Sequence, residues 1–333
     1  MPLLRAARVP VSPHVKVNAN ANTNTNANAN ARSRWLIDVL HALHALGANV
    51  AQIYFIPSAS IGWLLLAVLA LADWPAALTG LAASAGASCL ATALRLRHES
   101  RHDGRLGYNA ALTGIAFGAL WRPDAVFVAW LAVCVGLTVI TTAALARYRY
   151  RALTLPFVGA MSLTWAMQPW LRLLPRAPGA LACDTATPGF VFCSVGQVVF
   201  IAPLVLGLLT WYVLALWNAR ATLWALAAVI LVWTSLAATT ALWPAMAGQA
   251  GGIGINAFLA AFGLGMFERS AAQRFAGAAL ASLLCIVLGA MLGPRGWPYF
   301  TLPFNLAVWI MLRLPADRRQ PRLLRPWPKR QAS

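Results

Sequence analysis

Ten apolar stretches dominate the 333-residue chain and restrict what it can fold into. A helix needs roughly 20 apolar residues to cross a hydrocarbon core about 30 Å thick. Hydrophobic residues make up 60% of the chain and charged residues only 10%, whereas ordinary soluble domains carry about 25% charged residues. We therefore predict an all-α polytopic membrane protein. The predicted spans are 57–72, 75–94, 107–121, 124–146, 154–171, 201–217, 221–243, 254–267, 275–292 and 300–314.

The basic residues fall mainly on one side of these spans. With the N-terminus placed inside, four of the 26 Lys and Arg residues fall outside, namely Arg122, Arg172, Arg176 and Arg295. This positive-inside pattern predicts that both termini lie in the cytoplasm, and we expect the protein in a bacterial inner membrane. The net charge of +18 then reflects loops that face anionic membrane lipids. Nucleic-acid binding is disfavoured, because the charge is dispersed over the loops between spans.

The composition also predicts how the chain is divided. The run "NANANTNTNANANA" at 18–31 is polar and of low complexity, so we expect it to be disordered. In the loop that follows the fifth span, Cys183 and Cys193 could form a disulfide in an oxidising compartment. The predicted parts are a cytoplasmic tail 1–34, a first transmembrane repeat 35–172, an extracytoplasmic loop 173–192, a second repeat 193–316 and a basic cytoplasmic tail 317–333.

Three phrases occur twice, in the same order and at nearly one offset. They are "QIYF" and "QVVF", "GYNAALTGIAFG" and "GINAFLAAFGLG", and "LTLPF" and "FTLPF". Their paired residues are Gln52 and Gln197, 145 apart, Asn109 and Asn256, 147 apart, and Thr154 and Thr301, 147 apart. Chance would hardly supply all three pairs, so we interpret the chain as a tandem duplication of five spans.

An odd number of spans places the second copy upside down relative to the first. The loops agree with this prediction: "RLRHESRHDGR" before the first Gly-x-Asn phrase holds four arginines, and "PAMAGQAGG" before the second holds none. Inverted repeats place a solute site near the bilayer midplane, between the halves. A transport protein is the natural interpretation.

The repeated polar residues are the candidate site. Thr154 and Thr301 each stand two residues before a proline, so we expect N-terminal helix caps with mobile hydroxyls. Gln52 and Gln197 precede two short segments that could be re-entrant half-helices. Buried hydroxyls and amides need hydrogen-bond partners in hydrocarbon, and a polar solute can be that partner. A structural contact between helices is the alternative for any one of them.

The remaining predicted lining is apolar and partly aromatic. Flat rings beside oxygen acceptors suit a flat, neutral molecule rich in N–H donors, such as urea. The aromatic positions are equally compatible with ordinary core packing. These predicted lining residues are Phe55, Tyr108 and Leu112 in the first copy and Phe200, Ile255 and Leu259 in the second.

Together the doubled phrases resemble the urea transporter family, over about 35–316. The resemblance implies about ten transmembrane helices plus two re-entrant pore half-helices, a homotrimer with one pore per subunit, and channel-like diffusion of urea without a cofactor. It implies that Thr154 and Thr301 line the central constriction and that Gln52 and Gln197 begin two ladders of oxygen acceptors. The implied walls of the slot are Tyr108, Leu112 and Leu259, completed by Phe55 and by Val198 or Phe200. The repeated motif residues are Asn109, Asn256, Pro156, Pro303, Phe157 and Phe304.

Two departures from the family pattern leave the selectivity open among urea, short amides and ammonia. Ile255 stands where an aromatic residue is usual. The first copy reads "TLPFVG" where the second reads "TLPFN". Neither departure removes a hydrogen-bonding group from the proposed centre, so both concern selectivity rather than the class of protein.

Two other classes of function are weighed against this prediction. A proton- or sodium-coupled transporter normally carries an ionisable residue at membrane depth. Here Asp73 falls at a loop, Glu268 falls at a span end, and Asp38, His41 and His44 are expected before the first full span. No Cys, Asp or Glu completes a metal set with the two histidines. No H-E-x-x-H motif or nucleophile–base pair marks an intramembrane enzyme. We therefore predict a transporter with no metal site and no enzymatic activity.

Overall fold

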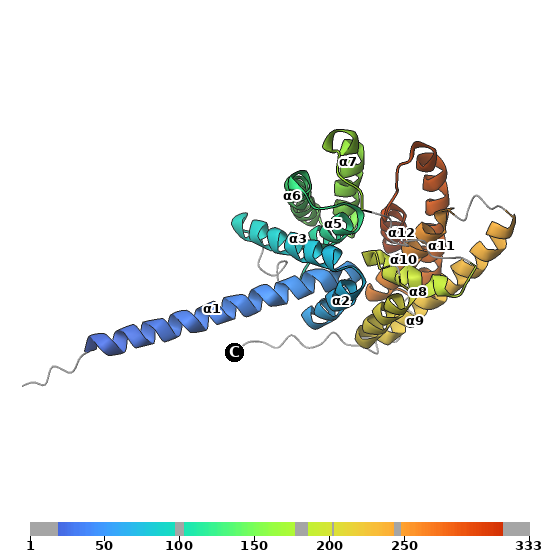
Figure 1. Ribbon diagram of the computed structural model, residues 1–333. Coiled ribbons are helices and arrows are strands. Elements are labelled where there is room, and N and C mark those ends of the chain that lie inside the picture. Colours follow the sequence, from blue (N-terminus) through green and yellow to red (C-terminus); the bar gives the residue numbers. More distant parts are fainter. Residues whose placement is uncertain (1–18, 97–102, 177–185, 202, 243–247, 316–333) are drawn as a thin grey trace, which may run out of the picture. The chain divides into compact units, whose positions relative to one another are not determined.

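The computed structural model describes residues 19–96, 103–176, 186–201, 203–242 and 248–315. The chain forms two compact units, 1–42 and 43–333, and each is described by itself. All regular elements within the described residues are helices. Figure 1 shows α3, α5, α6 and α7 gathered in one group and α8 to α12 in another. The helices of the first half are α1 (Ala19–Ala51), η1 (Gln52–Tyr54), α2 (Ala59–Ala72), α3 (Trp74–Ala93), α5 (Tyr108–Leu120), α6 (Ala125–Arg147) and α7 (Leu155–Leu171). Those of the second half are α8 (Gly189–Gly196), η2 (Gln197–Val199), α9 (Leu204–Leu242), α10 (Ala250–Met266), α11 (Ala271–Leu292), η4 (Gly293–Arg295) and α12 (Leu302–Arg313).

The lengths of these helices agree with a helical membrane protein. Within the described part of the chain, five segments are long and apolar enough to cross a membrane: Trp35–Tyr54, Trp74–Ala93, Ala125–Arg147, Leu204–Ala238 and Ala271–Arg295. Other helices are short, and α5 has 13 residues, which gives a length of about 20 Å. Such a helix cannot cross the hydrocarbon core alone.

Helix α1 corrects two predictions. Residues 19–34 are helical, not disordered, while residues 1–18 lie outside the described residues. Alanine is the best helix former, and extending an existing helix costs less than nucleating a new one. The candidate span Trp35–Tyr54 also contains Asp38, His41 and His44, which were expected before the first span. One charged residue in twenty leaves this segment apolar enough to be a span.

The two halves repeat the same helix partners. In the first half α5 contacts α3, α6 and α7, and in the second half α10 contacts α9, α11 and α12. The halves also contact each other, through α2 with α9 and through α7 with α12. The segments η1 and η2 each contact both α5 and α10. The ends of the two helices that precede them, α1 and α8, therefore lie where the halves meet.

Asp73 and Asn218, 145 residues apart, begin equivalent helices in the two halves. Their backbone angles nearly coincide, with φ −154° and ψ 89° at Asp73 and φ −150° and ψ 82° at Asn218. Each side chain caps the helix that follows, accepting from Ala76 N at 3.1 Å and from Ala221 N at 2.9 Å. The predicted spans 201–217 and 221–243 are thus the two parts of α9, joined at a non-helical Asn218.

Two glycines allow close helix packing at equivalent places. A Cβ atom on Gly62 would lie 1.7 Å from the carbonyl oxygen of Gly47, and one on Gly207 would lie 2.5 Å from that of Phe192. Real Cβ atoms do not approach other atoms so closely. The first helix of each pair, α1 or α8, therefore packs against the second, α2 or α9, only because each second helix carries a glycine.

Large apolar side chains are exposed on the outside of the helices. Leu71 is 74% exposed, Val205 73% and Val128 62%. In water such a surface would favour association, whereas a lipid bilayer accommodates it. This exposure supports the assignment of a membrane protein.

The loop predicted at 173–192 is only partly described. Arg176 forms a salt bridge of 2.8 Å with Asp73, which ties the start of the loop to the beginning of α3. Cys183 lies outside the described residues, so the disulfide with Cys193 stays a prediction.

Candidate functional site

The hydroxyl groups of Thr154 and Thr301 meet where the two halves join. Their Oγ1 atoms are 2.7 Å apart, a hydrogen bond in which either can donate. Both side chains are buried, with exposed fractions of 1% and 7%. Two residues in the same phrase, 147 positions apart, thus contact each other directly. This contact requires the two TLPF phrases to face one another.

These threonines are not helix caps, which corrects one detail of the prediction. Both stand at the N-cap position, before α7 and α12, but neither side chain accepts a hydrogen bond from its helix. Pro156 and Pro303 lie in the first turn, as predicted, where a missing N–H costs nothing. The hydroxyls point toward the opposite half instead. Both hydroxyls can therefore form hydrogen bonds at the junction rather than within their own helices.

The asparagine of each Gly-x-Asn phrase holds the backbone turn on which each threonine lies. Asn109 Nδ2 donates to the carbonyl of Leu153 at 3.1 Å, and Asn256 Nδ2 donates to that of Phe300 at 3.0 Å. Each Oδ1 accepts from the backbone N–H of the phenylalanine that follows the proline, at 3.2 and 2.9 Å. Leu153 and Phe300 have left-handed backbones, with φ 44° and 47°. The same carboxamide thus holds the same turn in both halves.

Asn305 breaks the equivalence of the halves, and sequence reasoning missed its role. Its Oδ1 accepts from Thr154 N at 3.0 Å. Its Nδ2 donates to Thr154 Oγ1 at 2.9 Å and to the carbonyl of Thr301 at 2.7 Å. The equivalent residue in the first half is Val158. The signal in the sequence was a polar residue in an apolar helix, noticed only as a departure from the repeat.

The consequence is that the two hydroxyls differ. Thr154 Oγ1 has two partners, Asn305 and Thr301. Among the described residues, Thr154 is the one partner of Thr301 Oγ1. A hydroxyl can donate once and accept twice. Thr301 therefore keeps more capacity to bind a solute than Thr154 does.

Gln52 and Gln197 end their helices rather than begin them, which corrects the prediction. Gln52 follows α1 and opens η1, and Gln197 follows α8 and opens η2. Each short 3₁₀ segment ends at a left-handed phenylalanine, Phe55 with φ 60° and Phe200 with φ 62°. The carbonyl of each glutamine is bonded to that phenylalanine's N–H, at 2.9 and 3.0 Å. After each glutamine, the chain thus changes direction at the left-handed phenylalanine and does not continue as a helix.

The side chain of Gln197 has unused hydrogen-bonding capacity. It is 8% exposed, and its Nε2 has no partner among the described residues. Gln52 is half-buried. A buried polar atom without a partner is costly, so a polar solute in this position would be stabilised by Gln197.

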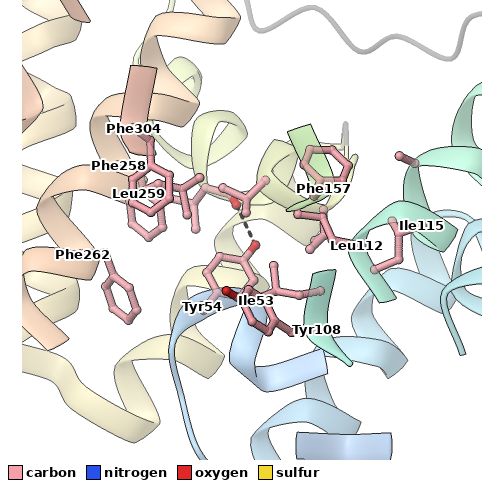
Figure 2. Close-up of a cluster of buried hydrophobic side chains, with 14 of the residues drawn as sticks. Ile53, Tyr54, Tyr108, Leu112, Ile115, Phe157, Phe258, Leu259, Phe262 and Phe304 are labelled. Atoms are coloured by element: carbon pink, nitrogen blue, oxygen red, sulfur yellow. Dashed lines mark hydrogen bonds between the residues drawn. The ribbon is translucent and has the colours of Figure 1, made fainter. Parts of the chain in front are cut away.

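Apolar residues of both halves surround this junction. Figure 2 shows Leu112 and Phe157 on one side of Tyr54, and Leu259 and Phe304 on the other. Both leucines are almost fully buried. The Tyr54 hydroxyl donates to the carbonyl of Val195 at 3.1 Å and so joins the halves. The side chains around this Tyr54 contact are thus mainly apolar (Figure 2).

Aromatic rings also pack across the junction. Phe157 meets Phe300 edge to face at 5.8 Å, and Phe55 lies 5.7 Å from Phe304. Tyr108 is buried and donates its hydroxyl to the carbonyl of Leu153. Of the remaining predicted lining residues, Val198 belongs to the buried core, and Phe200 and Ile255 are half-buried and pack against it.

Comparison with known protein families identifies a match over most of the chain. A family model described as "Urea transporter" matches residues 3–169 and 184–315. The two matched segments correspond to the two halves of the chain. No curated protein matches the sequence.

Proposed function

The chain belongs to the urea transporter family, and on this basis we propose that each protomer conducts urea through a pore centred on Thr154 and Thr301. Urea transport itself follows from the family. The finer proposal is channel-like facilitated diffusion down the urea gradient, with short amides as further permeants. The threonine contact is the observation that carries it, because it puts two hydroxyls in a dry place between the halves.

The physical argument concerns the cost of removing urea from water. Each N–H donor or carbonyl acceptor of urea left unpaired in an apolar slot costs about 1–3 kcal/mol. The Thr301 hydroxyl and the Gln197 carboxamide are buried groups with spare hydrogen-bonding capacity. They would replace part of the water that urea loses. Leu112 and Leu259 would keep the walls dry.

Several features of the assembly are proposed with this pore. We propose a homotrimer in a bacterial inner membrane, with both termini in the cytoplasm and membrane lipids around it. The proposal is supported by the family and by the distribution of Lys and Arg. The family is one of transporters rather than enzymes, so no catalytic residue is assigned.

Flux of labelled urea into liposomes tests this function. We expect uptake along the urea gradient that is unchanged by an imposed proton or sodium gradient. Uphill accumulation driven by either ion would favour a coupled transporter instead. Absence of uptake by folded protein would contradict urea conduction.

Urea flux is expected to be nearly flat between about pH 5.5 and 8, because threonine, glutamine and asparagine side chains do not titrate in this range. The measurement is initial uptake into liposomes at equal pH on both sides. His44 lies on the candidate span Trp35–Tyr54, so His44→Gln is the matched control. A steep pH profile that survives this substitution would show that another ionisable group acts in the pore.

Gln197→Leu is expected to lower urea flux about fivefold, for ~1 kcal/mol of lost hydrogen bonding in the pore. The variant should stay folded, because the Nε2 atom that it removes has no partner among the described residues. Gln197→Asn keeps a carboxamide with an N–H donor for the urea carbonyl and should conduct better than the leucine variant. Equal flux in the leucine variant and the parent would place Gln197 outside the permeation path.

A further inference from the structure

A second polar site lies away from the threonine pair, beside the loop that joins α6 to α7. It is a pocket of about 430 Å³ whose lining includes Arg149, Arg151 and Arg313. The salt bridges among the described residues are Arg105–Asp103 and Arg176–Asp73. Three arginines therefore line one pocket without a described carboxylate partner. Such a pocket favours an anion.

Arg149 occupies this position in a strained backbone conformation. Its φ is 60°, in the left-handed region. The equivalent residue of the second half, 147 positions later, is Gly296 with φ 66°. Glycine adopts this conformation without strain, whereas a residue with a Cβ does not. The first half thus keeps an arginine at a position where the second half has the better-suited residue, and that arginine is one of the residues that line the pocket.

The electrostatic surroundings strengthen the preference for an anion. Burial lowers the pKa of Arg151, and the positive charges of Arg105 and Arg269 lower it further. Its guanidinium lies 4.3 Å from the centre of the Phe267 ring, a contact that holds it in place. Several positive charges at close range create a positive potential that a bound anion would relieve.

The walls of the pocket indicate which kind of anion fits. Trp309 lies 6.3 Å from the Tyr150 ring, and its Nε1 donates to the carbonyl of Arg151 at 3.0 Å. Ile310 and Leu312 complete the apolar side, and Ile310 is 49% exposed. Tryptophan and tyrosine favour the level of lipid headgroups. A free phosphate ion would make no contact with the apolar wall, whereas the acyl chains of a phospholipid would pack against it.

We propose that this pocket binds the phosphodiester group of an anionic phospholipid, with the guanidinium groups around the phosphate and the acyl chains along Trp309, Ile310 and Leu312. The distribution of Lys and Arg assigns this side to the cytoplasm, where anionic lipids attract basic segments. The equivalent loop of the second half reads Gly296, Trp297 and Pro298. It carries no arginine at these positions, so the site belongs to one face of the membrane.

The full-length protein, delipidated in detergent, allows a direct test. Its Tm is measured with dihexanoyl phosphatidylglycerol, with dihexanoyl phosphatidylcholine and with inorganic phosphate at equal concentrations. We expect a rise in Tm with phosphatidylglycerol that clearly exceeds the rise with the other two. An equal rise with phosphatidylcholine would overturn recognition of an anion, and an equal rise with phosphate would overturn recognition of a lipid.

Two single substitutions, Arg149→Gly and Arg313→Gln, locate the site. Each should weaken the apparent affinity for phosphatidylglycerol about tenfold, as expected for one lost charge-assisted contact. Arg149→Gly should not lower the Tm in the absence of lipid, because glycine relieves the left-handed strain. A purely structural arginine would give the opposite result, a lower Tm with unchanged lipid binding, and that result would overturn the proposal.

The matched control removes equal charge from elsewhere on the surface. Arg95 and Arg220 are exposed and do not line the pocket. Arg95→Gln and Arg220→Gln should bind phosphatidylglycerol like the parent. If they weaken binding as much as the pocket variants, the interaction depends on net charge alone and the site is excluded. Urea flux in phosphatidylcholine liposomes should stay at the parent level for Arg149→Gly.

Discussion

Replacing Thr301 by valine is expected to lower urea flux about tenfold while the protein stays folded. Valine keeps the shape of threonine but lacks the hydroxyl group. The Thr301 hydroxyl bonds to Thr154 and keeps capacity for a further partner. Without it, urea would pass the threonine pair with one hydrogen bond fewer, and ~1.4 kcal/mol added to the barrier corresponds to a tenfold lower rate.

Stopped-flow uptake of urea into liposomes measures this effect, with Thr301→Ser as the control that keeps the hydroxyl. The serine variant should retain most of the flux. Folding is checked by the Tm and by the elution volume in detergent. Valine at 301 in a folded protein that conducts like the parent would mean that the threonine pair only holds the halves together.

Recurrence in the sequence located the centre of the candidate site. Thr154 and Thr301 were selected because one phrase occurs twice, and the structure places their hydroxyls 2.7 Å apart. The same reasoning selected Asn109 and Asn256, which make the same two backbone hydrogen bonds in each half. Residues that do the same work in both halves leave a repeated pattern, and that pattern is visible without a structure.

Features that depend on local backbone geometry were harder to predict. Gln52 and Gln197 were expected to precede half-helices, but Gln52 follows the long helix α1 and Gln197 follows the short helix α8. Apolar residues flank each glutamine on both sides, so hydrophobicity alone cannot tell which flank is the helix. The left-handed turn at Phe55 and Phe200 decides this, and phenylalanine is not a residue that signals such a turn.

A role that exists in one half only leaves no repeated pattern at all. Asn305 contacts Thr154 across 151 residues of sequence, and its counterpart is Val158. From the sequence this difference is a departure from the repeat. In the structure it is the reason why the two threonine hydroxyls have different partners.

Asn305→Val is therefore expected to lower the free energy of unfolding by about 2 kcal/mol, because it leaves the buried Thr154 N–H without its partner. This corresponds to a fall of roughly 3 °C in Tm for a protein of this size. It also removes the donor to Thr154 Oγ1, so urea flux should change as well. An unchanged Tm would mean that another group, such as water, replaces the carboxamide.

Exchanging the two residues tests whether the halves are related by a twofold axis at this point. In the double variant Val158→Asn/Asn305→Val, an asparagine at 158 would stand four residues after Thr154, as Asn305 stands four residues after Thr301. If the halves are equivalent here, it should accept from Thr301 N and donate to Thr301 Oγ1 and the Thr154 carbonyl. We expect the double variant to regain most of the Tm lost in Asn305→Val. Val158→Asn alone would instead place a second carboxamide in the junction beside that of Asn305.

Recovery of the Tm would show that the hydrogen-bond network depends on the axis and not on which half supplies the asparagine. Failure to recover would show that the surroundings of Val158, which is 6% exposed, differ too much for the inverted relationship to hold at the centre. In the recovered protein the hydroxyl with spare capacity would belong to Thr154, so the flux loss should then follow Thr154→Val more closely than Thr301→Val.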